Sequence, residues 1–211
     1  MTIICFFGPD GSGKTSLART LASDLQRNGH KIRLSWMRGS HTFASIIARF
    51  LGKFSVFKGK DNPYYQITIP KKFCSIWKFI EFISALPIIL LRFIIPDLLG
   101  STVIAERYVP DFIVWVTLTT EDPKYYNSFA SKFLIALALR SKVRLYLTAE
   151  YAELIKRRND IDHLFLQRQL VLYEKLATIL NAFKLDTTDK NVKESSEILW
   201  NFITNSNLIV K

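Results

Sequence analysis

The chain has 211 residues, of which 49% are hydrophobic and 22% are charged. This balance excludes an intrinsically disordered chain and predicts a single α/β domain over residues 1–211. The net charge of +11 favours anionic partners: nucleotides, nucleic acid or an acidic membrane surface. The sequence has neither an arginine-rich tract nor the aromatic–glycine pattern of an RNA-binding module, so we do not predict nucleic-acid binding.

The first predicted elements are a strand, a helix and a second strand. The continuous apolar run from Thr2 to Phe7 is typical of a strand that is buried on both faces. A helix is predicted from Gly13 to Asn28, and a strand from Lys31 to Met37. Because the chain begins directly with this pattern, we expect no signal peptide and a cytoplasmic location.

The middle of the chain is predicted to be mostly helical. A helix over Thr42–Leu51 precedes a basic, aromatic loop over Gly52–Pro70. The helical pattern then runs from Lys71 to Leu99, and Pro87 and Pro96 are expected to kink or break it.

This last segment is apolar enough to raise the question of a membrane span. Its longest uncharged stretch, Phe82–Leu91, has ten residues, whereas a spanning helix needs about 20 apolar residues. We therefore favour a core helix or a homodimer interface over a transmembrane helix. Shallow contact with a membrane surface is the alternative.

The second half of the chain alternates strands with helices. The predicted strands and helices are, in order, strand 102–105, helices 111–119 and 125–140, strand 142–148, helices 149–158 and 163–181, strand 183–186 and helix 192–203. With the two strands near the N-terminus, this alternation predicts a five-stranded parallel sheet flanked by helices.

One glycine-rich motif carries the strongest functional signal. Residues 8–15 read Gly-Pro-Asp-Gly-Ser-Gly-Lys-Thr and fit the spacing G-x-x-x-x-G-K-[ST], between a predicted strand and a predicted helix. The motif predicts a three-layer P-loop NTPase fold that binds ATP and Mg²⁺; the alternative is a glycine-rich turn without a ligand. The predicted nucleotide-binding residues are Gly8, Asp10, Gly11, Ser12, Gly13, Lys14, Thr15 and Ser16.

Within this loop, two side chains have predicted roles in phosphoryl transfer. Lys14 would reach the outer phosphates, and the Thr15 hydroxyl would hold Mg²⁺. At the end of strand 102–105, Glu106 would bind a Mg²⁺-bound water or act as a base. Arg107 beside it would clamp a phosphate; the alternative is an ordinary ion pair at a strand end.

Further charged residues are candidates for the lid and the acceptor site. Arg157 and Arg158 lie in a segment, residues 156–163, that we predict to fold over the triphosphate, although paired arginines also complement a helix dipole. Arg38 follows the second strand and would bind an acceptor phosphate, or merely cover the strand end. Asp10 is not needed for triphosphate binding and is expected to face a second substrate, unless it serves only as a turn former.

These stretches resemble the thymidylate kinase family of nucleoside monophosphate kinases. Residues 7–15 are similar to its phosphate loop, and Glu106-Arg107-Tyr108 resembles its D-R-[YH] signature with Glu in place of Asp. Leu145–Leu147, the helix to Arg158 and Arg168–Ala177 resemble the strand, lid and following helix. The resemblance implies that ATP phosphorylates dTMP to dTDP and that Asp10 reaches the sugar of the acceptor.

The sequence departs from this family at three places. Ser12 stands where some members carry an arginine, so the lid arginines would supply that charge. Arg38-Gly39 lies where the family has R-E-P-G, without the Glu and Pro, and no base-reading arginine is recognisable within Lys71–Arg92. These departures bear on thymine specificity more than on kinase activity.

Two alternative functions remain open. A deoxynucleoside kinase also has a Glu-Arg pair at the third strand, but it uses a carboxylate after the second strand, where this chain has Trp36-Met37-Arg38. The other alternative is a non-catalytic, peripheral-membrane protein that binds a nucleotide.

Overall fold

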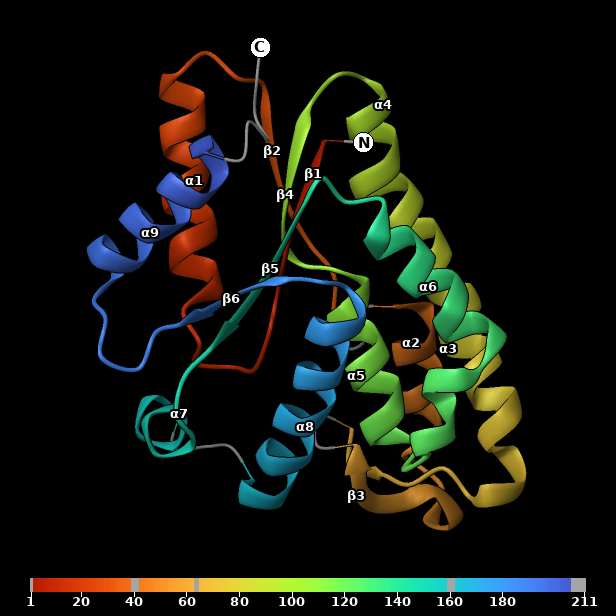
Figure 1. Cartoon of the computed structure of the whole chain (residues 1–211). Coiled ribbons are helices and arrows are strands. Elements are labelled where there is room, and N and C mark those ends of the chain that lie inside the picture. The colour runs from red at the N-terminus through yellow and green to blue at the C-terminus, as the bar shows by residue number, and fades with distance from the viewer. Residues whose placement is uncertain (1, 39–41, 63–64, 159–161, 206–211) are drawn as a thin grey trace.

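Five parallel strands form the central sheet of a computed structural model, which describes residues 2–38, 42–62, 65–158 and 162–205 (Figure 1). The strand order is β2-β4-β1-β5-β6. The strands are β1 Ile3–Phe7, β2 Ile32–Trp36, β4 Thr102–Arg107, β5 Val143–Thr148 and β6 Phe183–Asp186. All four neighbouring pairs are parallel, which confirms the predicted sheet.

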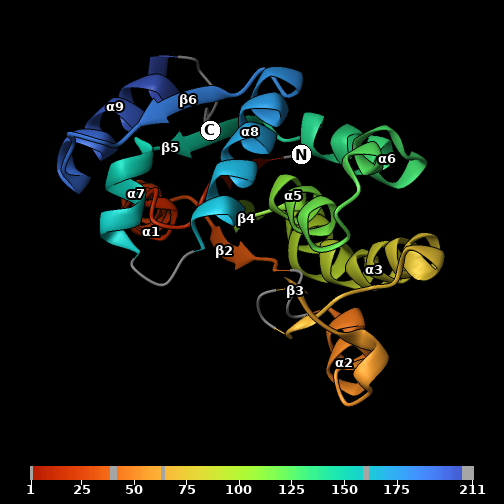
Figure 2. The same cartoon turned by 90° about the horizontal axis from the view of Figure 1, so that it is seen from below.

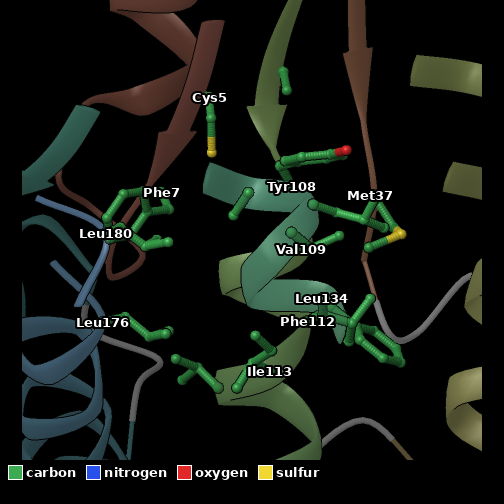
Figure 3. Close-up of a cluster of buried hydrophobic side chains, with 14 of the residues drawn as sticks. Cys5, Phe7, Met37, Tyr108, Val109, Phe112, Ile113, Leu134, Leu176 and Leu180 are labelled. Atoms are coloured by element: carbon green, nitrogen blue, oxygen red, sulfur yellow. The ribbon is translucent and has the colours of Figure 1, made fainter. Parts of the chain in front are cut away.

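Helices cover both faces of the sheet. One face carries α1 Lys14–Arg27 and α9 Val192–Asn205, whose apolar side chains pack with Ile4 and Phe6 of β1 (Figure 1). The other face carries α5 Val109–Thr119, α6 Phe129–Leu139 and α8 His163–Ile179. Figure 3 shows Cys5 and Phe7 of β1 pointing into this second cluster. The side chains of a strand alternate between its two faces, and both faces of β1 are covered by helices. Consecutive residues of β1 are therefore all buried, which explains its continuous apolar run.

The carboxyl end of β1 lies at a switch in the winding of the chain. The chain builds β2 and β4 on one side of β1 and then crosses to build β5 and β6 on the other. Loops that leave β1 and its two neighbours therefore diverge and open a crevice at this edge of the sheet. The glycine-rich loop, Glu106-Arg107 and the segment after β5 all meet at that edge.

The apolar segment after residue 70 is one long helical rod, as predicted, and of the two predicted effects of its prolines the structure excludes a break. Helix α3 spans Cys74–Ile89 and passes through Pro87, a π-helical turn covers Leu90–Ile94, and α4 continues over Ile95–Leu98. Pro87 removes one hydrogen-bond donor and crowds the preceding turn. The wider π turn directly after it absorbs the change without ending the helix.

This rod is only partly a core helix. Its inner side contributes Trp77, Phe82, Ala85 and Ile89 to buried clusters. Among the described residues, the rod Lys71–Leu98 is one helix whose length and composition would suffice to cross a membrane, and a third of its most apolar window is buried. The interpretation of a core helix therefore holds for one side of the rod.

The predicted loop over Gly52–Pro70 is more ordered than expected. After α2, Phe43–Leu51, a 3₁₀ turn at Ser55–Phe57 leads into β3, Lys58–Asn62. This strand forms antiparallel bridges to Ile67, which is 1% exposed. The burial of Ile67 and these backbone pairs compensate for the weak strand preference of a Lys-Gly-Lys-Asp-Asn sequence. Figure 2 shows α2 at the margin of the molecule, next to β3 and α3.

Candidate active site

The glycine-rich loop joins β1 to α1 in a conformation that its glycines allow. Gly13 precedes α1 in the left-handed conformation, with φ of 86°. Gly8 has φ of 143°, and a Cβ atom there would lie 2.0 Å from the carbonyl oxygen of Leu147. Only glycine is compatible with so close an approach to β5. The loop and the first turn of α1 thus direct backbone N–H groups towards the crevice, the arrangement that binds phosphate in P-loop proteins.

Lys14, the first residue of α1, lies inside this loop. Its ammonium group donates to the carbonyl oxygens of Gly8 at 2.7 Å and Pro9 at 2.6 Å, and the residue is 4% exposed. Burial, with the charge of Arg107 adding to it, lowers the pKa of Lys14 to about 7. The carboxylates of Asp10, Asp111 and Glu106 oppose this shift only in part, so a bound triphosphate would stabilise the charged ammonium further and the loop favours an anionic ligand.

Thr15 and Glu106 meet although 91 positions separate them in the sequence. The Thr15 hydroxyl donates to the carboxylate of Glu106, which extends from the end of β4. Hydroxyl and carboxylate oxygens suit Mg²⁺, which keeps waters and phosphate oxygens among its ligands. The described residues include no group of three His, Cys, Asp or Glu side chains that could hold a metal ion. A Mg²⁺ ion at this pair would therefore draw further ligands from phosphates and water.

Asp10 connects the loop to two arginines, one at the end of β4 and one just after the end of β2. Arg107 at the end of β4 donates to Asp10 Oδ1, and Arg38 Nη2 lies 3.5 Å from Asp10 Oδ2. Burial would raise the pKa of Asp10, but the charges of Arg107, Lys14 and Arg38 outweigh it and lower the pKa to about 2. Asp10 is therefore ionised and holds both guanidinium groups at the mouth of the crevice.

Two buried residues that the sequence analysis did not single out hold Arg107 from its other side. Asp111 Oδ1 lies 3.5 Å from Arg107 Nη1 and accepts a hydrogen bond of 2.8 Å from the Tyr173 hydroxyl. Burial raises the pKa of Asp111, against the opposing effect of Arg107. Asp111 could have been found from its position in the first turn of α5, only four residues after Arg107 in the sequence. Tyr173 has no such local signal, because it joins the site from α8.

The two lid arginines have different surroundings. Arg157, the last residue of α7 (Tyr151–Arg157), donates to the carbonyl oxygens of Gly11 at 3.2 Å and Thr187 at 2.8 Å. It also donates to Glu153 at 2.9 Å. Arg158 instead lines the hollow above the phosphate loop. Residues 159–161 of the predicted lid lie outside the described part of the chain.

Three hollows follow one another along this edge of the sheet. The first, of about 510 Å³, lies over the phosphate loop and is bordered by ten of the thirteen predicted site residues: Asp10, Gly11, Gly13, Lys14, Thr15, Ser16, Arg38, Glu106, Arg107 and Arg158. The predicted residues outside it are Gly8, Ser12 and Arg157. Ser12 is buried and its hydroxyl donates to the Pro9 carbonyl oxygen at 2.8 Å, so that side chain stabilises the loop.

A narrow second hollow, of about 50 Å³, shares Asp10, Arg38 and Arg107 with the first. Its further lining residues, which the sequence analysis did not predict, are Met37, Asp111, Trp115, Leu118, Phe165, Gln169 and Tyr173. A third and wider hollow, of about 900 Å³, shares Leu118 and Phe165 with the second. The arginine pair thus stands between the phosphate loop and a separate space with aromatic walls.

Comparison with known proteins agrees with this fold. A family model described as "ATPase family associated with various cellular activities (AAA)" matches residues 4–81, which include the phosphate loop. No curated protein matches the sequence. Among solved structures, thymidylate kinase from Candida albicans is similar with a TM-score of 0.67 at 17% sequence identity, over 98% of this chain and 93% of that one. The chain thus has a P-loop NTPase fold that resembles the fold of thymidylate kinase.

Proposed function

We propose that the protein is a nucleoside monophosphate kinase that uses ATP and Mg²⁺, with dTMP as the leading candidate acceptor. The placement of Arg38 and Arg107 on Asp10, between two adjoining hollows, is the observation that carries this proposal. One hollow borders the phosphate loop and suits the donor triphosphate. The other, of about 50 Å³, has room only for a small group such as the acceptor phosphate beside the arginines, and the adjoining hollow of about 900 Å³ would hold the rest of the acceptor.

The positive charge at the boundary favours an acceptor that already carries a phosphate. Arg38, Arg107 and Lys14 face Asp10, with Asp111 behind Arg107. Guanidinium groups bind phosphate through paired hydrogen bonds, and Asp10 and Asp111 hold them in place for this. A deoxynucleoside kinase uses a carboxylate base just after its second strand. This chain has Met37 and Arg38 after β2, and neither can serve as that base.

In this proposal, the site residues have separate roles in the transfer of the phosphoryl group. Lys14 and the loop amides stabilise the charge on the transferred phosphoryl group, and Arg107 with Arg38 orients the acceptor for in-line attack. Asp10 orients the arginines and contacts the acceptor sugar. Thr15 and Glu106 would hold Mg²⁺, which would neutralise charge on the donor phosphates when bound.

Between the two lid arginines, we assign the catalytic role to Arg158. The Arg158→Ala variant is expected to lower kcat at least ~10-fold with little change in melting temperature, because the side chain borders the donor hollow. The Arg157→Ala variant is expected to lose about 1–3 kcal/mol of stability, because its hydrogen bonds join Gly11 to Thr187. Steady-state kinetics and thermal unfolding of both variants check this. Equal loss of kcat at unchanged stability in both would contradict the assignment.

A screen of acceptors tests the proposed function. ADP release from ATP should be measured with each nucleoside monophosphate and each nucleoside, with and without Mg²⁺. We expect stimulation by at least one monophosphate, dTMP first, and none by nucleosides. Stimulation by nucleosides alone would indicate a deoxynucleoside kinase, and no stimulation by any acceptor would remove the kinase proposal in favour of a non-catalytic nucleotide-binding protein.

A further inference from the structure

Helices α2 and α3 present large apolar side chains to solvent on adjoining surfaces. We define the apolar face by six of these side chains: Phe43, Ile46 and Phe50 on α2, and Ile76, Phe79 and Ile83 on α3. Those on α2 are 58–65% exposed and those on α3 are 45–63% exposed. A cluster of this kind is unusual on a soluble monomer and marks a surface that contacts something apolar.

The two helices share one hollow, so their apolar side chains form a continuous surface. Phe43 of α2 lies across this hollow, of about 510 Å³, from Phe79 and Ile83 of α3. Pro87 also lines it, which continues the apolar lining along the rod towards the π turn. Figure 2 shows α2 and α3 at the margin of the molecule, outside the central sheet.

Packing within the chain explains the apolar residues on the inner side of α3, but not those on its outer side. Trp77, Phe82 and Ala85 are buried inwards, whereas Ile76, Phe79 and Ile83 point away from that core. A helix that merely closed a soluble core would carry polar residues on its outward side. The outward side of α3 therefore suits contact with an apolar partner outside this chain.

The segment that carries the apolar face is basic in sequence, although Lys78 pairs with Asp122 and Arg92 stacks on Trp36. Between Phe43 and Pro96 the sequence has eight lysines and arginines, but only two acidic residues, Asp61 and Glu81. Glu81 is 2% exposed on the inner side of α3. No carboxylate on α2 or α3 is therefore exposed, whereas Lys53, two residues after α2, and Lys71, three residues before α3, are exposed.

This charge pattern discriminates between two occupants of the apolar face. A symmetric dimer through α2 and α3 would bring basic residues of two copies together, without exposed carboxylates on these helices to pair with them. A bilayer with anionic headgroups instead complements both properties, since it takes up apolar side chains and attracts the basic residues around them.

We propose that the apolar face of α2 and α3 docks the protein on a membrane surface rich in anionic lipids. The rod lies parallel to the surface, with Phe79 and Ile83 at the boundary between headgroups and acyl chains. Its inner side stays packed on the protein core. This inference is independent of the phosphoryl acceptor, because none of the residues that define the face borders the active-site hollows.

Flotation of the full chain with lipid vesicles tests the proposal. The vesicles are neutral phosphatidylcholine, alone or with about one third phosphatidylserine. We expect binding to the anionic vesicles at 0.1 M salt and weaker binding at 0.5 M salt, where headgroup attraction is screened. The double variant Phe79→Gln/Ile83→Gln should reduce vesicle partitioning at least ~10-fold, because two apolar side chains are removed from the contact. The charge variant Lys53→Glu/Lys71→Glu should also reduce it.

Matched variants on other helices, away from the residues of the apolar face, serve as controls. Val171→Gln/Val192→Gln changes two residues that are 70% and 50% exposed on α8 and α9, and Lys190→Glu/Lys193→Glu reverses two exposed charges near α9. Both controls should bind vesicles as the unchanged chain does. Circular dichroism of every variant establishes that the fold is retained.

Two results would overturn the proposal. One is the absence of binding to anionic vesicles, or equal binding of the unchanged chain and the folded Phe79→Gln/Ile83→Gln variant. The other is a dimer in sedimentation experiments that this variant converts to a monomer without any vesicle binding by the unchanged chain. That second result would assign the apolar face to a copy–copy interface, one of the two interpretations that the sequence favours.

Discussion

Replacement of Lys14 by alanine is expected to lower turnover at least ~100-fold, since an ammonium group that stabilises the transferred phosphoryl group is lost. Lys14 is buried in the phosphate loop, where its present partners are the carbonyl oxygens of Gly8 and Pro9. The reaction would develop negative charge in this hollow, and water cannot take the place of a buried cation without a large cost. Measurement of kcat at saturating ATP and acceptor checks the prediction.

The comparison needs a variant that removes a lysine without touching the site. Lys193→Ala serves this purpose, because Lys193 is exposed on α9. Its kcat should equal that of the unchanged protein, and thermal unfolding of the Lys14 variant should establish that the loss is not one of folding. Near-normal turnover in a folded Lys14→Ala protein would reject the proposed mechanism.

Replacement of Glu81 by glutamine is expected to make the protein more stable at alkaline pH. Burial raises the pKa of Glu81 from 4.5 to about 8, against smaller opposing effects of the Thr42 and Trp115 side chains. The folded state therefore keeps a proton that the unfolded state releases between pH 4.5 and 8, so stability falls as the pH rises through this range. The contribution lost is at most about 5 kcal/mol.

Denaturant unfolding at pH 5 and pH 8.5 measures this effect. The unchanged protein should lose stability between these pH values, and Glu81→Gln, which removes the ionisation at nearly the same volume, should lose markedly less. Glu197→Gln is the control, because Glu197 is exposed on α9. An identical decrease in the unchanged protein and the Glu81→Gln variant would show that Glu81 does not titrate in the folded state as described.

Much of the fold was predictable because its signals are local. The apolar run before Gly8, the glycines at fixed spacing and the lysine at the start of α1 all lie within fifteen residues, where backbone geometry couples them directly. The alternation of strands and helices likewise follows from local periodicity. The strands of the sheet agree with their predicted ranges to within two residues at each end.

The acceptor side of the candidate site was less predictable, for a physical reason. Asp10, Arg107 and Tyr173 form one network through Asp111, although the loop after β1, the end of β4 and α8 contribute them separately. Pairs this far apart in sequence leave no spacing pattern, since they meet only when the sheet is assembled. The sequence alone does not distinguish Arg157 from Arg158. They differ in the folded chain because Gly11 and Thr187 lie close enough together for Arg157 to donate to the carbonyl oxygens of both.

The sequence by itself determined the phosphate loop, the parallel α/β sheet and the edge of that sheet where the candidate site lies. Local spacing and periodicity are sufficient for these features. Only the tertiary structure decided which charges meet beside the loop and which side of the rod Lys71–Leu98 faces outwards. An evenly apolar helix has no polar stripe to orient it, so its buried side is chosen by the surfaces it packs against.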